Sequence, residues 1–329
     1  MNPEARWRTM SDLWNLLSAP EFYAMVLQLA TPLVFAALAA VVSNKAGVLN
    51  IGIEGTMVLA ALAAALFSTW SGSAFVGVVC GVGAGLLMGG FFALCAVRFR
   101  TNHILVGIAI NLLSAGLAVF IVYAITGNKS DYPGIAMTPW DVPLFKEIPF
   151  VGDVLFRQVN PLVFVAVLCV FMIRFLFRRT VLGVRILAVG KNPVAAASVG
   201  IHTRRIKTVA LLIAGGLAGL GGAYLSLGYM SNFNTGMVAG RGFIGIAAEA
   251  IGGGHPVATA LFALVFGAVN AFSLAAQTFT SITVPYELLN TLPYLTTAAG
   301  LVVYSLIRYR QSTHHSSKRR ISHEKSVGD

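Results

Sequence analysis

Two carboxylates interrupt otherwise apolar sequence, and Glu54 is the first of them. It closes a polar interruption over residues 44–55 and directly precedes the apolar run 56–67. An ionisable group at membrane depth is costly, so it is a functional-site hypothesis by default. A carboxylate at the start of a helix is also favoured by the helix dipole and by the free N–H groups there. We therefore expect Glu54 and Asn50 either to fix a broken helix or to contact a substrate.

Glu249 is the second carboxylate. It stands just before a break over residues 252–256, where three glycines and a proline separate two apolar runs. A place in a solute pathway and a role as a buried structural partner both remain open for it. Three further polar side chains are expected chiefly as hydrogen-bond partners between helices, and the first of them also as a pathway candidate: Asn111, Asn270 and Gln277.

A basic stretch contains the third notable pattern, a short helix with signals at both ends. Asn192 is a good N-cap, Pro193 suits the first helical position, and Gly200 suits the position after the last turn. The resulting helix, 193–199, is too short to be stable alone. We expect it either to dock on a partner protein or to lie as a simple connector on its own chain.

Patterns for catalysis or for a metal site are missing from the sequence. A P-loop requires GxxxxGK followed by Ser or Thr, because the lysine and the hydroxyl meet phosphate and magnesium. Here Lys191 is followed by Asn192, and Arg185 stands where the first glycine would be. The three cysteines have no zinc-like spacing. We expect a non-hydrolysing chain with no catalytic residue, no metal and no cofactor.

The elements that must position these residues are membrane helices. Of the 329 residues, 57% are hydrophobic and only 11% are charged, against about 25% charged in soluble domains. We expect an all-α polytopic membrane protein with eight to ten membrane-embedded helices, some of them broken or re-entrant. The expected pieces are 22–42, 56–67, 74–97, 104–125, 161–177, 208–227, 243–251, 257–277 and 288–307. Two of these, 56–67 and 243–251, are too short to cross at about 1.5 Å per residue.

Basic residues predict the orientation. The net charge is +11, and the stretch 178–207 holds seven basic residues and no acidic one. The positive-inside rule makes this stretch and the basic tail at 308–329 cytoplasmic, and makes the loop at 127–160 external. The basic residues lie beside apolar segments, so nucleic acid is not an expected partner. The chain thus divides into a polar N-terminal segment at 1–21, a transmembrane domain at 22–307 and the tail.

The side of the N-terminus is ambiguous in the sequence. Three embedded pieces before the basic loop at Arg98 would place the N-terminus outside, whereas Arg6 and Arg8 favour the inside. The conflict disappears if the interruption at 44–54 forms a re-entrant pair that is not a normal crossing. We prefer this second interpretation.

Small residues repeat on one predicted helix. Lipid gives no hydrophobic drive for helix association, so close backbone approach through small residues takes its place. We expect tight packing along a stripe formed by Gly77, Gly81, Gly85 and Gly89. A weaker stripe occurs at Gly215 and Gly219.

Several of these motifs together resemble the permeases of ATP-binding cassette (ABC) importers, within the group that serves branched-chain amino acids, simple sugars and nucleosides. The resemblance is closest to nucleoside permeases and covers about residues 30–307. It rests on these segments in this order: 44–48 with 50–55, 190–196 with 200–201, 240–247, and 292–296. One position departs from the pattern, because Lys191 stands where an acidic residue often follows the first glycine of the cytoplasmic motif.

The resemblance implies a non-hydrolysing permease subunit in the bacterial inner membrane, moving a nucleoside or a simple sugar. It implies a cytoplasmic ABC ATPase, a second permease in a heterodimer, and an extracytoplasmic substrate-binding protein as partners, with membrane lipid around the chain. The ATPase would couple through the short helix and its flanks: Asn192, Pro193, Ala195, Ala196 and Gly200. The solute pathway would include Asn50, Glu54, Asn111 and Glu249. The residues alone also allow a secondary, ion-coupled transporter, since broken helices bind solutes there too.

Overall fold

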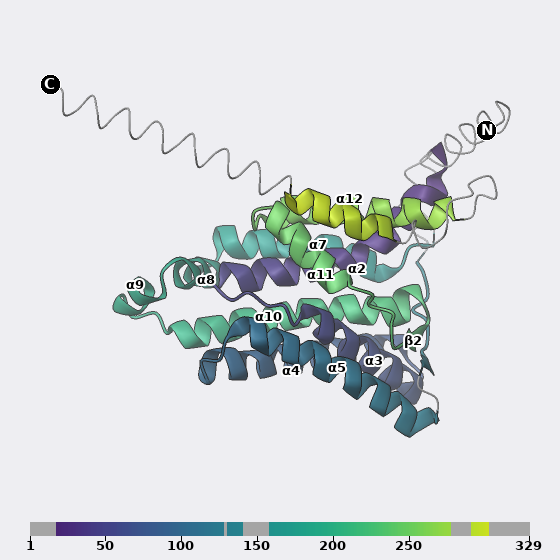
Figure 1. Ribbon diagram of the computed structural model, residues 1–329, viewed down its shortest axis with the longest axis horizontal. Helices are drawn as coiled ribbons and strands as arrows, with labels where there is room; N and C mark the ends of the chain where they lie inside the picture. The colour runs from purple at the N-terminus through teal and green to yellow at the C-terminus, as the bar shows by residue number, and fades with distance from the viewer. Residues whose placement is uncertain (1–17, 128–129, 141–157, 278–290, 303–329) are drawn as a thin grey trace.

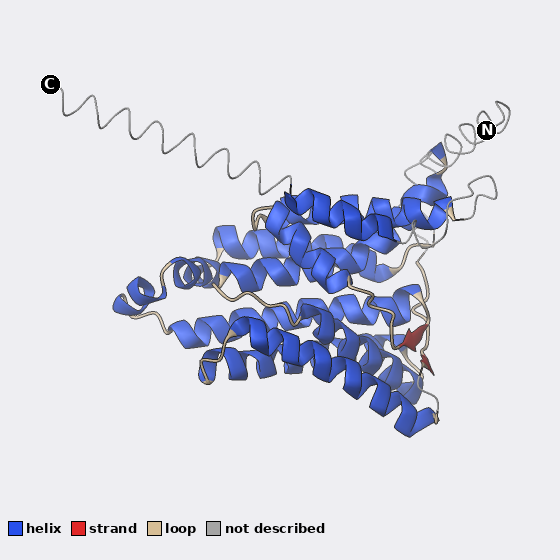
Figure 2. Ribbon diagram, in the orientation of Figure 1, coloured by secondary structure: helices blue, strands red, loops and turns tan. Residues whose placement is uncertain are grey.

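The computed structural model describes residues 18–127, 130–140, 158–277 and 291–302. Within them the chain is almost wholly helical (Figure 2). The helices are α2 (Pro20–Lys45), α3 (Ile53–Ser71), α4 (Ala74–Ala93), η1 (Leu94–Arg98), α5 (His103–Thr126), α7 (Pro161–Arg179), α8 (Val181–Lys191), α9 (Pro193–Ser198), α10 (Thr203–Ala223), η3 (Tyr224–Tyr229), α11 (Arg241–Ile251) and α12 (Pro256–Ala276). Residues 291–302 are also helical. Two short strands, β1 (Asp131–Pro133) and β2 (Asn232–Asn234), pair antiparallel.

Seven helices of the described part are long and apolar enough to cross a membrane. They confirm the expected all-α polytopic membrane fold. The expectation that 56–67 is too short to cross is wrong, because α3 has 19 residues and begins at Ile53, inside the polar stretch. In contrast, α11 has only 11 residues. Most of the predicted segment 1–21, all of 308–329 and much of the loop 127–160 lie outside the described residues.

The two ends of the bundle differ in chemistry. The basic end carries α8, α9 and the start of α10, and the strand end carries β1 and β2 (Figure 1). In the same view α2, α7, α11 and α12 lie on one side and α3, α4 and α5 on the other, with α10 between them. Asparagine and threonine caps begin several helices: the Asn102, Asn160 and Thr180 side chains each accept a hydrogen bond from a backbone N–H of the following first turn.

The first helices run between these ends in alternation. Phe22 clusters with Ala271 of α12 at the strand end, whereas Lys45 lines a cavity with Arg178 at the basic end. After the break, α3 returns to the strand end, where the Thr69 hydroxyl donates to the Pro133 carbonyl of β1 (2.7 Å). The preferred interpretation of 44–54 as a re-entrant pair is therefore wrong. The start of α2 lies at the end opposite Arg178.

Glycines set the distance between α4 and its neighbours. The predicted stripe is buried. Its two N-terminal members, Gly77 and Gly81, face the backbone of α3. Gly85 and Gly89 face α10, where a Cβ added to Gly85 would lie 2.7 Å from the Gly219 Cα. The two glycine stripes thus meet, and van der Waals contact between the two backbones replaces contact between side chains.

Replacing Gly85 with alanine is expected to destabilise the protein by about 1–3 kcal/mol, because the added methyl group has no room against α10. Gly83 is on the same helix, and a Cβ there would meet nothing within 4 Å. Gly83→Ala is therefore the matched control, and it should be neutral or stabilising by roughly 0.5–1 kcal/mol. Thermal unfolding of both variants in one detergent measures the difference; equal melting temperatures would contradict the packing assignment.

Candidate functional site

Two asparagines bind the backbone in and next to the first helix break, residues 46–52 between α2 and α3. The Asn50 side chain is buried, and its Oδ1 accepts from the Gly52 N–H (3.0 Å). Asn111 of α5 accepts from the Gly55 N–H through Oδ1 (2.8 Å) and donates to the Ile51 carbonyl through Nδ2 (3.2 Å). Non-helical backbone at membrane depth must have such partners. Asn111 therefore does bond between helices, and it fixes the start of α3.

Glu54 joins the two broken helices. Its two carboxylate oxygens accept hydrogen bonds from the Gly240 N–H and the Gly242 N–H, both at 2.7 Å. These N–H groups belong to the cap and first turn of α11, where the helix dipole favours a negative charge. Gly240 has a φ of 77°, which glycine adopts without strain. A Cβ on Gly242 would lie 2.7 Å from the Glu54 Cα, so the approach requires glycine.

The other end of α11 is held by the end of α2. The Glu249 side chain is buried, and both of its oxygens accept from Asn44 Nδ2, at 2.9 and 3.0 Å. The Lys45 ammonium lies close by: its Nζ would be 2.8 Å, and Glu249 Oε1 3.3 Å, from a Cβ placed on Gly254. A neutral amide donor and a nearby cation thus compensate a carboxylate taken out of water.

Together these contacts place α11 as a short helix anchored at both ends. Glu54 lies at its first turn, and Asn50 and Asn111 bind the backbone at the start of α3, on either side of Glu54 in the contacts they make. Glu249 lies at its last turn, about 12 Å farther along the helix at 1.5 Å per residue. In the described residues each of the four side chains binds the protein's own backbone or amides.

Sequence reasoning missed the partners of these side chains. It did not pair Glu54 with Gly240 and Gly242, nor Glu249 with Asn44, because each pair is far apart in the chain. The glycines on either side of Arg241 were the available signal for a close approach of backbone. Asn270, expected to bond between helices, instead donates to the Phe266 carbonyl of its own helix (2.9 Å).

A second candidate region is the projecting helix α9. The Asn192 Oδ1 accepts from the N–H groups of Val194 (3.1 Å) and Ala195 (3.0 Å), as its capping role predicts. Ala196 is buried, and Gly200 has a φ of 82°. Figure 1 shows α9 as the tip of the molecule at the basic end. Pro193 occupies the first helical position.

The exposed side of α9 is apolar, and the end of α8 that precedes it contacts the end of α2 and the start of the first break. Val194 is 79% exposed and Val199 is 74% exposed. At the end of α8, a Cβ on Gly190 would lie 2.9 Å from the Lys45 carbonyl carbon, and a Cβ on Gly47 would lie 3.1 Å from the Gly190 Cα. The α8–α9 unit is therefore in backbone contact with the segment that leads to Glu54.

Comparison with known proteins gives consistent results. Residues 22–305 match the family model described as branched-chain amino acid transport system, permease component. The chain is 28% identical to the nucleoside ABC transporter permease protein NupC of Lactococcus lactis, over 85% of this chain and 91% of the relative. It is 31% identical to the guanosine ABC transporter permease protein NupQ of Bacillus subtilis, over 74% and 79% of the two chains.

The name of a third relative gives a different solute. The chain is 30% identical to the putative glucose ABC transporter permease protein TsgC13 of Haloferax volcanii, over 85% of this chain and 90% of the relative. In each of these three organisms a second, differently named permease protein also matches, at 26% or 27% identity. No solved structure matches the chain.

Replacing Glu54 with glutamine is expected to destabilise the protein by about 1–3 kcal/mol, because the amide accepts only one of the two N–H groups and leaves the other unpaired. Glu21 is exposed in the first turn of α2 and makes the matched control. Thermal unfolding should separate Glu54→Gln from Glu21→Gln. A melting temperature for Glu54→Gln equal to that of the control would mean that the carboxylate does not hold α11.

Proposed function

The chain belongs to the family of permease components of branched-chain amino acid transport systems, and from this premise we propose that it is the permease subunit of an ABC importer for a nucleoside. Members of this family are non-catalytic transmembrane subunits. A simple sugar is the second candidate solute. The names of two relatives, NupC and NupQ, support a nucleoside, and the name of TsgC13 supports a sugar.

The basic end is the cytoplasmic end in this proposal. Residues 178–207 carry seven basic side chains and no acidic one, and such stretches remain on the cytoplasmic side. The strand end, with β1 and β2, then faces outward and receives solute from an extracytoplasmic binding protein. The chain resides in the plasma membrane of a bacterial cell.

The apolar tip of α9 is the observation that best supports coupling of this permease to an ABC ATPase. Val194 lies in this short helix, which projects from the basic end, and Val199 directly follows it; both side chains are exposed. Exposed apolar side chains grouped on a projecting element are typical of a protein contact. We assign this surface to a cytoplasmic ATPase subunit, with the Asn192 cap, Pro193 and the residues up to Gly200 keeping the helix in shape.

The contacts from α9 inward reach the candidate pathway. Gly190 adjoins Lys45 and Gly47, and the segment after Gly47 leads to Asn50 and Glu54. A displacement of α8 and α9 by the ATPase would therefore move the break between α2 and α3. Glu54 would transmit this displacement to α11. Asn50, Glu54, Asn111 and Glu249 shape the pathway in this proposal by fixing the broken helices.

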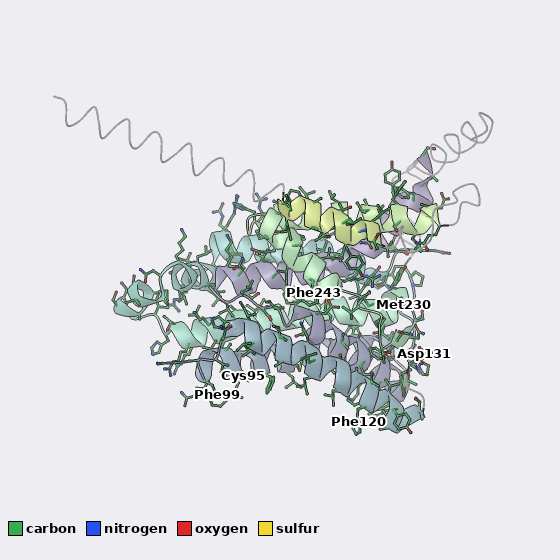
Figure 3. All side chains as sticks on the ribbon, in the orientation of Figure 1. Cys95, Phe99, Phe120, Asp131, Met230 and Phe243 are labelled. Atoms are coloured by element: carbon green, nitrogen blue, oxygen red, sulfur yellow. The ribbon has the colours of Figure 1, made fainter. Side chains whose placement is uncertain are left out.

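A second permease completes the pathway. Each of three organisms has two different permease proteins that resemble this chain, which supports a heterodimer. Phe243 of α11 is 47% exposed. In Figure 3 it lies over the middle of the molecule, away from the basic end, where Cys95 and Phe99 are labelled. An apolar side chain exposed on the anchored helix is available to a second subunit.

The double substitution Val194→Asp with Val199→Asp should lower ATP-driven uptake at least tenfold, because two charges at an apolar contact oppose docking by more than about 1.4 kcal/mol. Uptake into proteoliposomes and recovery of the ATPase with the purified permease measure the effect. Thr101 is exposed at the same end, outside α9. Thr101→Asp is the control for added charge and should transport normally. Full uptake by the double variant would remove α9 from the coupling role.

The energy source distinguishes the ABC importer from an ion-coupled transporter. Uptake should require ATP and the ATPase inside the proteoliposomes, since the permease only transmits closure of its partner. Proton and sodium ionophores should leave the rate unchanged. Uptake that an ionophore abolishes and that proceeds without the ATPase would overturn the proposal.

A further inference from the structure

A polar cavity of about 330 Å³ lies in the strand-end half of the molecule. It is formed between α2, η3, α11, α12 and the helical residues 291–302. Its volume is at the lower limit of the roughly 300–1,000 Å³ that small-molecule sites occupy. Its polar lining consists of Tyr229, Arg241, Asn270, Ser273, Gln277 and Tyr294. So many polar groups around one cavity are costly in a membrane domain and indicate a use.

Arg241 presents hydrogen-bond donors to this cavity. Its Nη1 donates to the Met237 carbonyl (2.6 Å) and to the Val238 carbonyl (3.3 Å), which fixes the plane of the guanidinium. Among the described residues the other guanidinium N–H groups have no partner, and Arg241 lines the cavity. A fixed guanidinium with free donors suits a ligand that offers acceptor atoms side by side.

Asn270 supplies the complementary group. Its Nδ2 donates to the Phe266 carbonyl, so the orientation of the amide is set within α12. Within the described part of the chain, Oδ1 has no hydrogen-bond donor. The cavity therefore pairs a donor side, Arg241, with an acceptor side, Asn270. A ligand that matches both must carry acceptors and an N–H or O–H donor.

Two tyrosines add flat surfaces. The Tyr294 hydroxyl donates to the Ala239 carbonyl (2.8 Å), and a Cβ on Gly240 would lie 3.3 Å from Tyr294 Cε1, so the ring is held against the backbone. Ala239 itself has a φ of 47°, a strained conformation for alanine. Such strain is commonly kept at binding sites. Tyr229 lines the same cavity from η3.

We propose that this cavity binds the base of a nucleoside on its way through the permease. The base stacks on a tyrosine ring, its carbonyl and ring nitrogen accept from Arg241, and its exocyclic N–H donates to Asn270. Aromatic side chains stack on any nucleobase, and arginine pairs with the two neighbouring acceptors of guanine, O6 and N7. This proposal rests on the nucleoside assignment made above. It adds the site and the groups that recognise the base.

The cavity adjoins the first turn of α11, the end that Glu54 holds. Arg241 lies between Gly240 and Gly242, whose N–H groups bind Glu54. A base bound to Arg241 is therefore one residue from the contact that joins α3 to α11. The first turn of α11 thus contacts both the proposed base site, through Arg241, and the start of α3, through Glu54.

The test uses the whole importer, with ATPase, second permease and binding protein, in proteoliposomes. Uptake of radiolabelled guanosine and of glucose is measured for Asn270→Leu, Tyr294→Leu and Tyr294→Phe. The two leucine variants should reduce guanosine uptake at least tenfold with a higher KM, and Tyr294→Phe, which keeps the ring, should retain most of it. Tyr123 is exposed on α5, away from the cavity lining, and Tyr123→Leu is the control. The affinity of the binding protein for guanosine should not change.

The outcomes separate the two proposals. If the unmodified importer moves guanosine and the leucine variants move it equally well, the cavity proposal is overturned and the nucleoside assignment stands. If the importer moves glucose and not guanosine, the nucleoside assignment fails and the cavity proposal fails with it. Photolabelling of the unmodified importer with 8-azidoguanosine does not depend on the folding of any variant. Label on the peptides that contain Tyr229 or Tyr294 supports the site, and label only elsewhere overturns it.

Discussion

The structure depends on the need to satisfy backbone polar groups where a helix is interrupted in a membrane. The chain breaks its helices before α3 and on both sides of α11, and each break exposes N–H or carbonyl groups that lipid cannot bind. Glu54 satisfies two N–H groups of α11 at once, and Asn111 satisfies one donor and one acceptor at the start of α3. Without these side chains, the first turns of α3 and α11 would each keep unpaired backbone groups at membrane depth.

The structure also depends on close approach between backbones. Glycine allows this approach at three contacts between elements that take part in the proposed mechanism. Gly242 allows Glu54 to reach α11, Gly245 faces the backbone of α2, and Gly190 faces Lys45. At these positions a methyl group would clash with backbone, because it would lie less than 3.0 Å from the nearest backbone atoms. In the proposed mechanism, displacements would therefore pass between elements with no intervening side chains to rearrange and absorb them, since packed backbones are not continuously deformable.

The described bundle holds its two proposed binding regions, one apolar and one polar, far apart. The tip of α9 and the strand-end cavity lie at opposite ends, and the anchored helix α11 lies between them. This arrangement fits a subunit that receives solute at one end and a mechanical input at the other. The chain needs no catalytic group for either role, because the energy enters through a contact with another protein.

The sequence by itself determined the membrane fold, the presence of helix breaks near Asn50 and after Glu249, and the capped helix after Asn192. These follow from local properties: apolar run length, glycine and proline in sequence, and side chains that bond within one turn. The glycine spacing in α4 was equally readable, because residues four apart share a helix face. Tertiary structure alone decided the direction of α2 and α3 and the partners of Glu54 and Glu249. Those pairings join residues 186 to 205 positions apart, and a carboxylate's partner at that separation is set by how the helices pack, which no local pattern encodes.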